Sequence, residues 1–139
     1  ICSTLTERYR YTSNTVFDSF PWPQAPNKKD VKAVADASRG LRKVRGELRK
    51  KHNLSLRELY RSAELPGIHP LDAAHDELDA AVRKTYGMKP RADPLKFLFE
   101  LNQELAAKED KAEPIVGPGL PDALRSDKTL RSSDSLTMP

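Results

Sequence analysis

The chain has few of the features that mark secreted, membrane-bound or disulfide-stabilised proteins. Its 139 residues include one cysteine, Cys2, which excludes an internal disulfide and fits a reducing compartment. No apolar run approaches the roughly 18 residues of a membrane-spanning helix, and no signal-peptide pattern opens the chain. Apolar residues make up 37% and charged residues 32%, which predicts a modest core under a strongly charged surface. We therefore expect one cytoplasmic domain without a membrane partner.

A catalytic or metal-binding cluster is also missing. One predicted helix carries four polar residues at spacing i, i+3, i+4 and i+7, namely Asp72, His75, Asp76 and Asp79. Metal binding needs ligands that converge from more than one element, and no second cluster is visible. His75 borders the apolar stripe of its helix, where a packed and hydrogen-bonded histidine is the ordinary outcome. We expect no catalytic residue and no metal ligand in this chain.

Capping residues and apolar periodicity predict four helices, over residues 28–51, 55–64, 70–86 and 93–108. Asn27 is a good N-cap for the first helix, and Ser55 with Glu58 forms a capping-box pattern for the second. Pro70 suits the first turn of the third helix, and His69 before it is placed to cap a helix end.

Both ends of the chain contain prolines, the C-terminal end also contains glycines, and neither end is predicted to be helical. Residues 8–17 are rich in Tyr, Thr and Val, which predicts a short extended or β segment. Phe17, Phe20 and Trp22 then stand among prolines; this string most simply packs on a neighbouring surface, and a stacking platform for a base is the alternative. We expect a mainly α fold, a small bundle of about four helices. Its divisions are an extended segment (1–26), a helical domain (27–108) and a disordered or surface-draped tail (109–139).

The positive charge of the chain is concentrated in the first predicted helix. Residues 28–51 hold ten Lys and Arg against three acidic residues, whereas residues 52–139 are net acidic. Such asymmetry indicates a polyanion or an acidic partner facing the helix, although a solvated outer face is the simpler alternative. If the partner is DNA, cationic side chains neutralise phosphates without reading sequence. The candidates are Arg39, Arg42, Lys43, Arg45 and Arg49.

A second candidate DNA contact precedes the aromatic residues. Arg8, Arg10 and Asn14 carry side chains that can read base edges. Arg8 also follows Glu7, so an ordinary ion pair is the alternative for that residue.

Three stretches of the chain resemble a known family. They are residues 14–23 (Asn-Thr-Val-Phe-Asp-Ser-Phe-Pro-Trp-Pro), 59–71 (Leu-Tyr-Arg through Leu-Pro-Gly to His-Pro-Leu) and 74–87 (Ala-His-Asp-Glu-Leu-Asp-Ala-Ala-Val to Tyr-Gly). Over roughly residues 9–102 the chain resembles large adenine-specific DNA methyltransferases of the type IIG/IIL restriction–modification class. The similar parts are the end of the target-recognition region and the C-terminal helical domain.

This resemblance implies that the full-length enzyme moves a methyl group from S-adenosylmethionine to adenine N6 of double-stranded DNA in the bacterial cytoplasm. The chain itself has no Asn-Pro-Pro-aromatic motif to hold an adenine, no glycine-rich cofactor loop and no Asp/Glu-x-Lys nuclease cluster. It begins at Ile1 rather than Met. We therefore expect a non-catalytic, cofactor-free C-terminal piece whose partners are DNA and the upstream methyltransferase and recognition domains of the same polypeptide. The alternative is a helical protein–protein docking module whose basic face meets an acidic partner.

Overall fold

The computed structural model describes residues 3–4, 9–10, 16–17 and 19–130. Its contacts divide the chain into two compact units. The helical unit is Pro26–Gly87, and the flanking unit combines Ile1–Ala25 with Met88–Pro139. The described residues contain four α-helices, so the predicted mainly α fold is confirmed.

The longest helix, α1 (Lys28–His52), begins and ends where local chemistry directs it. The Asn27 side chain accepts a hydrogen bond from the Asp30 N–H at 2.9 Å, which satisfies one of the donors left free at a helix start. At the other end Asn53 adopts the left-handed conformation (φ 50°), which Asn tolerates better than most residues.

Two shorter helices complete the helical unit. The capping box predicted for α2 (Leu56–Ala63) is present: the Glu58 carboxylate accepts from the Ser55 N–H at 2.8 Å, and the Ser55 hydroxyl accepts from the Glu58 N–H at 3.3 Å. The N-cap of α3 (Pro70–Thr85) is His69, whose Nδ1 accepts from the Leu71 N–H at 3.2 Å.

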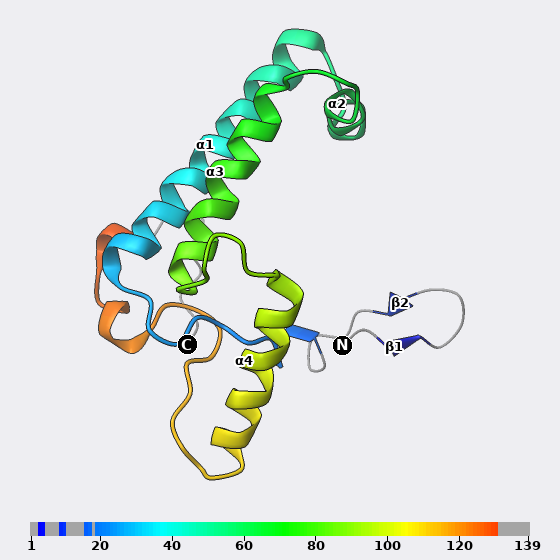
Figure 1. Cartoon of the computed structure of the whole chain (residues 1–139). Helices are drawn as coiled ribbons and strands as arrows, with labels where there is room; N and C mark the ends of the chain where they lie inside the picture. Colours follow the sequence, from blue (N-terminus) through cyan, green and yellow to red (C-terminus); the bar gives the residue numbers. More distant parts are fainter. Residues whose placement is uncertain (1–2, 5–8, 11–15, 18, 131–139) are drawn as a thin grey trace. The chain divides into compact units, whose positions relative to one another are not determined.

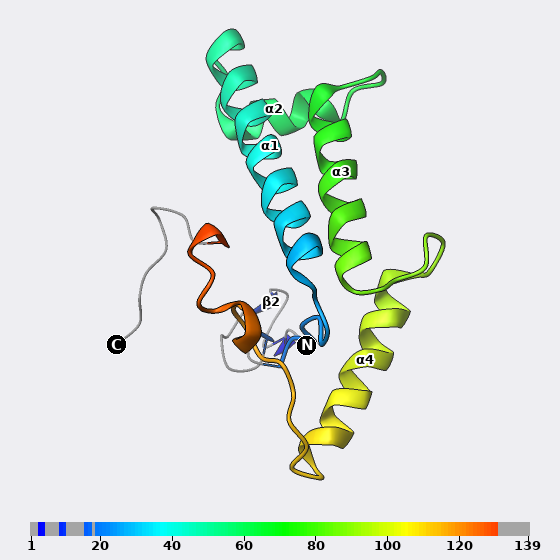
Figure 2. The ribbon, with the colours of Figure 1, turned by 90° about the vertical axis from the view of Figure 1, so that its left-hand side faces the viewer.

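The hydrophobic core of the helical unit lies where its three helices meet. Leu41 of α1, Leu59 of α2, and Leu71 and Ala74 of α3 form one buried cluster. In Figures 1 and 2, α1 and α3 lie side by side, and α2 crosses the end where α1 finishes and α3 begins. The helices α1 and α3 are antiparallel, and Lys84 near the end of α3 pairs with Asp30 near the start of α1 at 3.4 Å.

The flanking unit contains α4 (Pro94–Glu109), two paired two-residue strands, and two 3₁₀ turns, Asp122–Leu124 and Lys128–Leu130. The strands β1 (Ser3–Thr4) and β2 (Tyr9–Arg10) are antiparallel. Trp22 packs edge-on against Phe17 and Phe20, with ring centroids 5.4 and 5.2 Å away. The Gln24 side chain donates to the Val116 carbonyl at 3.0 Å and accepts from the Val116 N–H at 2.9 Å. None of the described helices is long and apolar enough to cross a membrane.

The extended segment expected over residues 8–17 is not shown. Arg8 and residues 11–15 lie outside the described residues, and β2 covers only Tyr9–Arg10. The predicted boundaries after residues 26 and 108 remain predictions, as does the tail beyond them.

Candidate nucleic-acid interface

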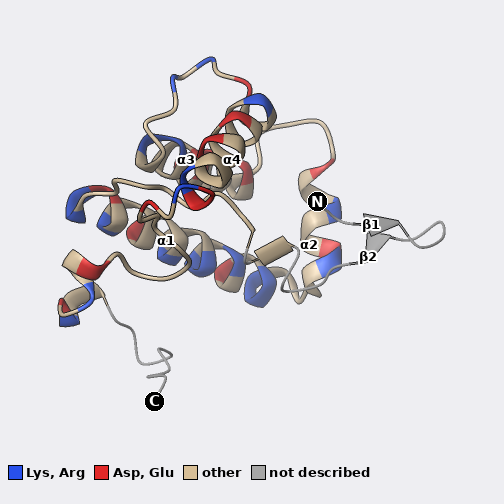
Figure 3. Ribbon diagram, turned by 90° about the horizontal axis from the view of Figure 1, so that it is seen from below, with Lys and Arg blue, Asp and Glu red and all other residues tan. Residues whose placement is uncertain are grey.

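The solvent-facing side of α1 carries a line of cations. Residues 7, 11 and 18 positions apart return to nearly the same side of a helix with 3.6 residues per turn. Lys32, Arg39, Lys43 and Lys50 have these spacings, and all four are exposed. Figure 3 shows Lys and Arg distributed along α1, with few acidic positions among them. The face opposite to this line contains Val34, Ala37 and Leu41, which pack toward the core side.

Four of the cations surround a glycine. The positions three and four residues either side of Gly46 are its neighbours on the helix surface, and they are Arg42, Lys43, Arg49 and Lys50. All four residues and Gly46 itself are exposed. Within the described part of the chain, a Cβ built on Gly46 would meet no atom within 4 Å. We call this arrangement the Gly46 cation ring.

Local partners restrain some of these cations without neutralising the surface. Lys43 lies 3.9 Å from Glu47, and both side chains are mostly exposed, so this pair contributes little. Arg49 donates its Nε–H to the Leu54 carbonyl at 3.3 Å, a neutral acceptor that leaves the positive charge in place. Arg39 is paired with Asp36 one turn earlier.

The structure sorts the predicted DNA-contacting residues of α1 into three groups. Arg42, Lys43 and Arg49 belong to the Gly46 cation ring, whereas Arg39 lies further along the helix beside Asp36. Arg45 is only half exposed, because its position turns toward the packed side of α1. Lys50 is one of the cations counted in the first predicted helix but is not among the five named candidates, although it lies four residues from Gly46. Contact of any of them with DNA remains a prediction.

The second predicted set cannot be assembled into a site. Arg8 and Asn14 lie outside the described residues, and Arg10 is placed only as the last residue of β2. The base-reading role of these three residues therefore stays a prediction.

No other backbone among the described residues approaches Gly40 or Gly46 closely. A Cβ at either position would meet open space. The two glycines are therefore not required by packing within the described chain.

The polar residues of α3 form no metal site in the described part of the chain, where no three His, Cys, Asp or Glu side chains come together. His75 instead faces Tyr60, with its Nε2 3.1 Å from the phenol oxygen and the ring centroids 5.7 Å apart. This contact joins α3 to α2 and gives His75 the structural role expected beside an apolar stripe.

These features define a class of protein: a mainly helical domain with a small buried core and a cationic outer helix. Residues 25–109 match the family model for the C-terminal domain of MmeI, and the chain belongs to that family. The domain is the C-terminal region of an MmeI-like restriction–modification enzyme. No curated protein and no solved structure matches the chain.

Proposed function

We propose that this chain is the non-catalytic C-terminal part of an S-adenosylmethionine-dependent DNA adenine N6-methyltransferase of a restriction–modification system. In this role it supports the target-recognition region and contacts the DNA backbone through α1. The observation that carries the proposal is the Gly46 cation ring, on the exposed face of a helix within a restriction–modification family domain.

The cation ring has the chemistry of a phosphate contact. Its members lie within the nine residues 42–50, which span about 12 Å along the helix axis, so their charges converge on a small area. Lys and Arg that neutralise phosphates release condensed counterions, which gives affinity without sequence preference. Gly46 leaves a gap among long side chains, so a phosphate can approach the helix backbone while cations reach it from both sides.

Salt-dependent binding of duplex DNA tests this role. Replacing Arg42 and Lys50 with Gln should weaken binding to all duplexes and reduce the slope of log affinity against log salt by about 0.9 per lost contact. The control is Lys96→Gln with Lys111→Gln, which changes the net charge equally but lies in the flanking unit. Equal effects of the two double variants would show that net charge, rather than the ring, sets the affinity.

The two open glycines of α1 allow a second test. Gln at position 40 or 46 should stabilise the helix by up to about 1 kcal/mol, because glycine is a poor helix former and neither site is crowded. Gly46→Gln should nevertheless weaken DNA binding several-fold, whereas Gly40→Gln should leave it unchanged. Thermal unfolding and DNA titration of both variants measure the two effects. Weakening by both variants alike would contradict a contact centred on Gly46.

The proposed lack of catalysis has its own test. The chain carries no glycine-rich cofactor loop and no adenine-holding motif, so it should bind no S-adenosylmethionine. Titration calorimetry with the cofactor should give no heat of binding. Micromolar binding would show that the domain takes part in the methyl transfer.

The second candidate function is a helical docking module whose basic α1 face meets an acidic protein surface, and exposed apolar residues after α2 add contact area for a protein partner. Leu65 and Ile68 are 67% and 103% exposed, which is unusual for aliphatic side chains in a small domain. If no duplex binds even at low salt, the docking function replaces DNA contact as the role of this domain.

A further inference from the structure

The loop between α2 and α3 exposes apolar side chains at its tip, and a contact between two polar side chains closes the loop at its base. Its residues Leu65, Pro66 and Ile68 are all exposed, with Ile68 as accessible as in an extended chain. The base is closed by a contact of 3.3 Å between the Ser62 hydroxyl and His69 Nε2. The Ser62 hydroxyl also donates to the Leu59 carbonyl at 2.6 Å. We call residues 64–68 the loop tip.

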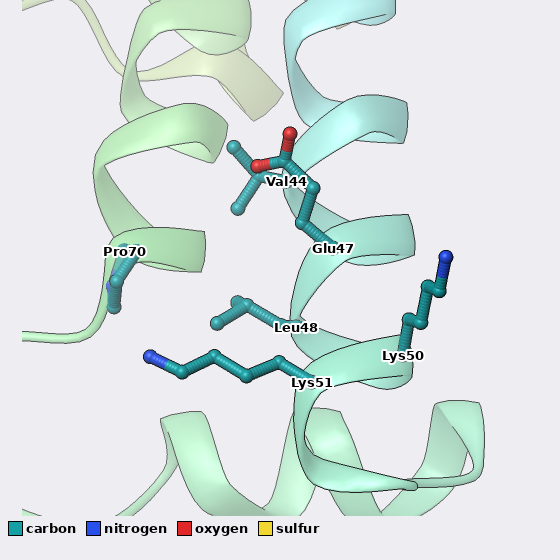
Figure 4. A pocket seen from close by; sticks show the side chains of 6 residues that line it. All are labelled: Val44, Glu47, Leu48, Lys50, Lys51 and Pro70. Atoms are coloured by element: carbon teal, nitrogen blue, oxygen red, sulfur yellow. The ribbon is translucent and has the colours of Figure 1, made fainter.

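A hollow of about 640 Å³ lies beside this loop, between α1 and the start of α3. Val44, Leu48 and Pro70 supply its apolar surface (Figure 4). The Lys51 side chain reaches across it toward Pro70, whereas Lys50 points away. Glu47 lies at the other end of the hollow, where Lys43 is 3.9 Å away.

The loop tip and the hollow complement each other in polarity and charge. The tip offers two aliphatic side chains and the carboxylate of Glu64, and the hollow offers an aliphatic surface and the ammonium group of Lys51. Glu64 and Lys51 form no ion pair within the described residues. Pro70, which lines the hollow, follows Ile68 by two residues, so the loop that carries the tip leads directly to the edge of the hollow.

We propose that this surface joins two copies of the chain, with the loop tip of each copy in the hollow of the other. A surface that carries a projection next to a matching hollow is self-complementary, which is what a two-fold symmetric dimer requires. Within one chain the tip does not fill the hollow, because Leu65 and Ile68 are both exposed. The contact between copies buries Leu65 and Ile68 and gives Glu64 and Lys51 opposite charges to pair with.

The area involved is small, so the dimer is weak. Two short loops and two hollows belong to the lower range of specific interfaces, which bury about 1,200 Å² or less in total. The dimer therefore forms reversibly and is populated only at high protein concentration. Lys50 of the Gly46 cation ring also lines the hollow, so the dimer is tested at Ile68, Glu64 and Lys51, which do not belong to the ring.

Sedimentation over a concentration series tests the apolar part of the interface. The unmodified chain should shift from monomer to dimer as its concentration rises. Ile68→Ser should weaken the association by roughly tenfold or more, because buried anchors dominate small interfaces. Leu95→Ser is the control, since Leu95 is 80% exposed but lies on α4. A chain that stays monomeric throughout, or an Ile68→Ser variant that dimerises normally, overturns the proposal.

Reversing the charge of Glu64 or of Lys51 tests whether these two residues pair between the two copies. Glu64→Lys and Lys51→Glu should each weaken dimerisation, because like charges then face each other between copies. An equimolar mixture of the two variants should recover it, since each tip then meets a hollow of opposite charge. The control Lys32→Glu makes the same charge change at an exposed position of α1 away from the hollow. Failure of the mixture to recover, with both variants shown by circular dichroism to be folded, overturns the pairing of tip and hollow.

Discussion

The two compact units of this chain are stabilised in different ways. In the helical unit, side chains from three helices meet in one buried cluster around Leu59 and Leu71, each 1% exposed. In the flanking unit the described residues contain one buried hydrophobic side chain of this kind, Leu105. Its described contacts include aromatic edge contacts around Trp22, the hydrogen bonds of Gln24 and a hydrogen bond from the Asn102 side chain to the Ser19 carbonyl. The helical unit therefore has the larger cluster of buried apolar side chains, whereas long-range hydrogen bonds and ring contacts join the segments of the flanking unit.

Leu71→Ala should have the largest effect, and it should act on the helical unit. Removing a fully buried leucine costs about 2–5 kcal/mol, depending on how far the neighbours relax. The helical unit contains most of the helix, so circular dichroism reports its unfolding midpoint. Trp22 is the only tryptophan of the chain and lies in the flanking unit, so its fluorescence reports that unit separately.

Circular dichroism and Trp22 fluorescence, measured on the same variant, test whether the two units unfold separately. We expect Leu71→Ala to lower the midpoint measured by circular dichroism and to leave the fluorescence midpoint nearly in place. Leu95→Ala, at a side chain that is 80% exposed, should move neither. Equal shifts in both signals would show that the units unfold as one cooperative body.

Gln24→Ala should have an intermediate effect, and it should act on the flanking unit. The variant loses a hydrogen bond of 2.8 Å to the Trp22 carbonyl as well as both hydrogen bonds to Val116. Part-buried groups left without partners cost about 1–3 kcal/mol. The unfolding midpoint measured by fluorescence should fall, and the midpoint measured by circular dichroism should stay unchanged. The control is Gln103→Ala, at an exposed position of α4. A fall in the circular dichroism midpoint alone would show that Gln24 stabilises the helical unit and not the flanking unit.

The smallest expected effect is a dependence on pH in the helical unit. Hydrogen bonds from the Ser55 hydroxyl, and then from the Ser55 backbone N–H, lower the pKa of Glu58 below its ordinary value of 4.5. A carboxyl group with a lowered pKa in the folded state stabilises that state above pH 4.5, and this contribution is lost as the pH falls through the lowered pKa. Unfolding followed by circular dichroism from about pH 7 to about pH 3 should show this loss.

Glu58→Gln separates the capping box from other carboxyl groups. The variant should be less stable at neutral pH and should lose less stability on acidification than the unmodified chain. Glu109→Gln at the end of α4 should keep the original pH dependence of the helical unit. An unchanged acid response in Glu58→Gln would show that other groups control it.

Much of the helical architecture could be predicted because its signals are local. Asn27, Ser55 and Pro70 lie where the sequence placed them, and all four helices end within about two residues of the predicted bounds. The interior of α4 could not be predicted in the same way. Leu95 belongs to its apolar stripe but is 80% exposed, because a stripe shows which face can be buried and not which partner covers it.

The candidate site was predictable in part for the same reason. Charge counting along the sequence indicated α1, and spacing alone could have assembled the ring around Gly46. The half-burial of Arg45 depends on the packing of α1 against its neighbours, which periodicity does not determine. The hollow likewise arises from the meeting of α1 and α3, which brings together Leu48 and Pro70, 22 positions apart in sequence.

The contacts of His69 have a consequence for the position of a single proton. Nδ1 accepts the Leu71 N–H, so it carries no hydrogen, and Nε2 must then be the protonated nitrogen that donates to the Ser62 oxygen. The Ser62 hydroxyl in turn donates to the Leu59 carbonyl, so all donors in this chain of contacts point the same way, from α3 toward α2. Only the neutral Nε2–H tautomer of His69 is compatible with all three of these hydrogen bonds. The single ring of His69 therefore caps α3 with one nitrogen and connects it to α2 with the other.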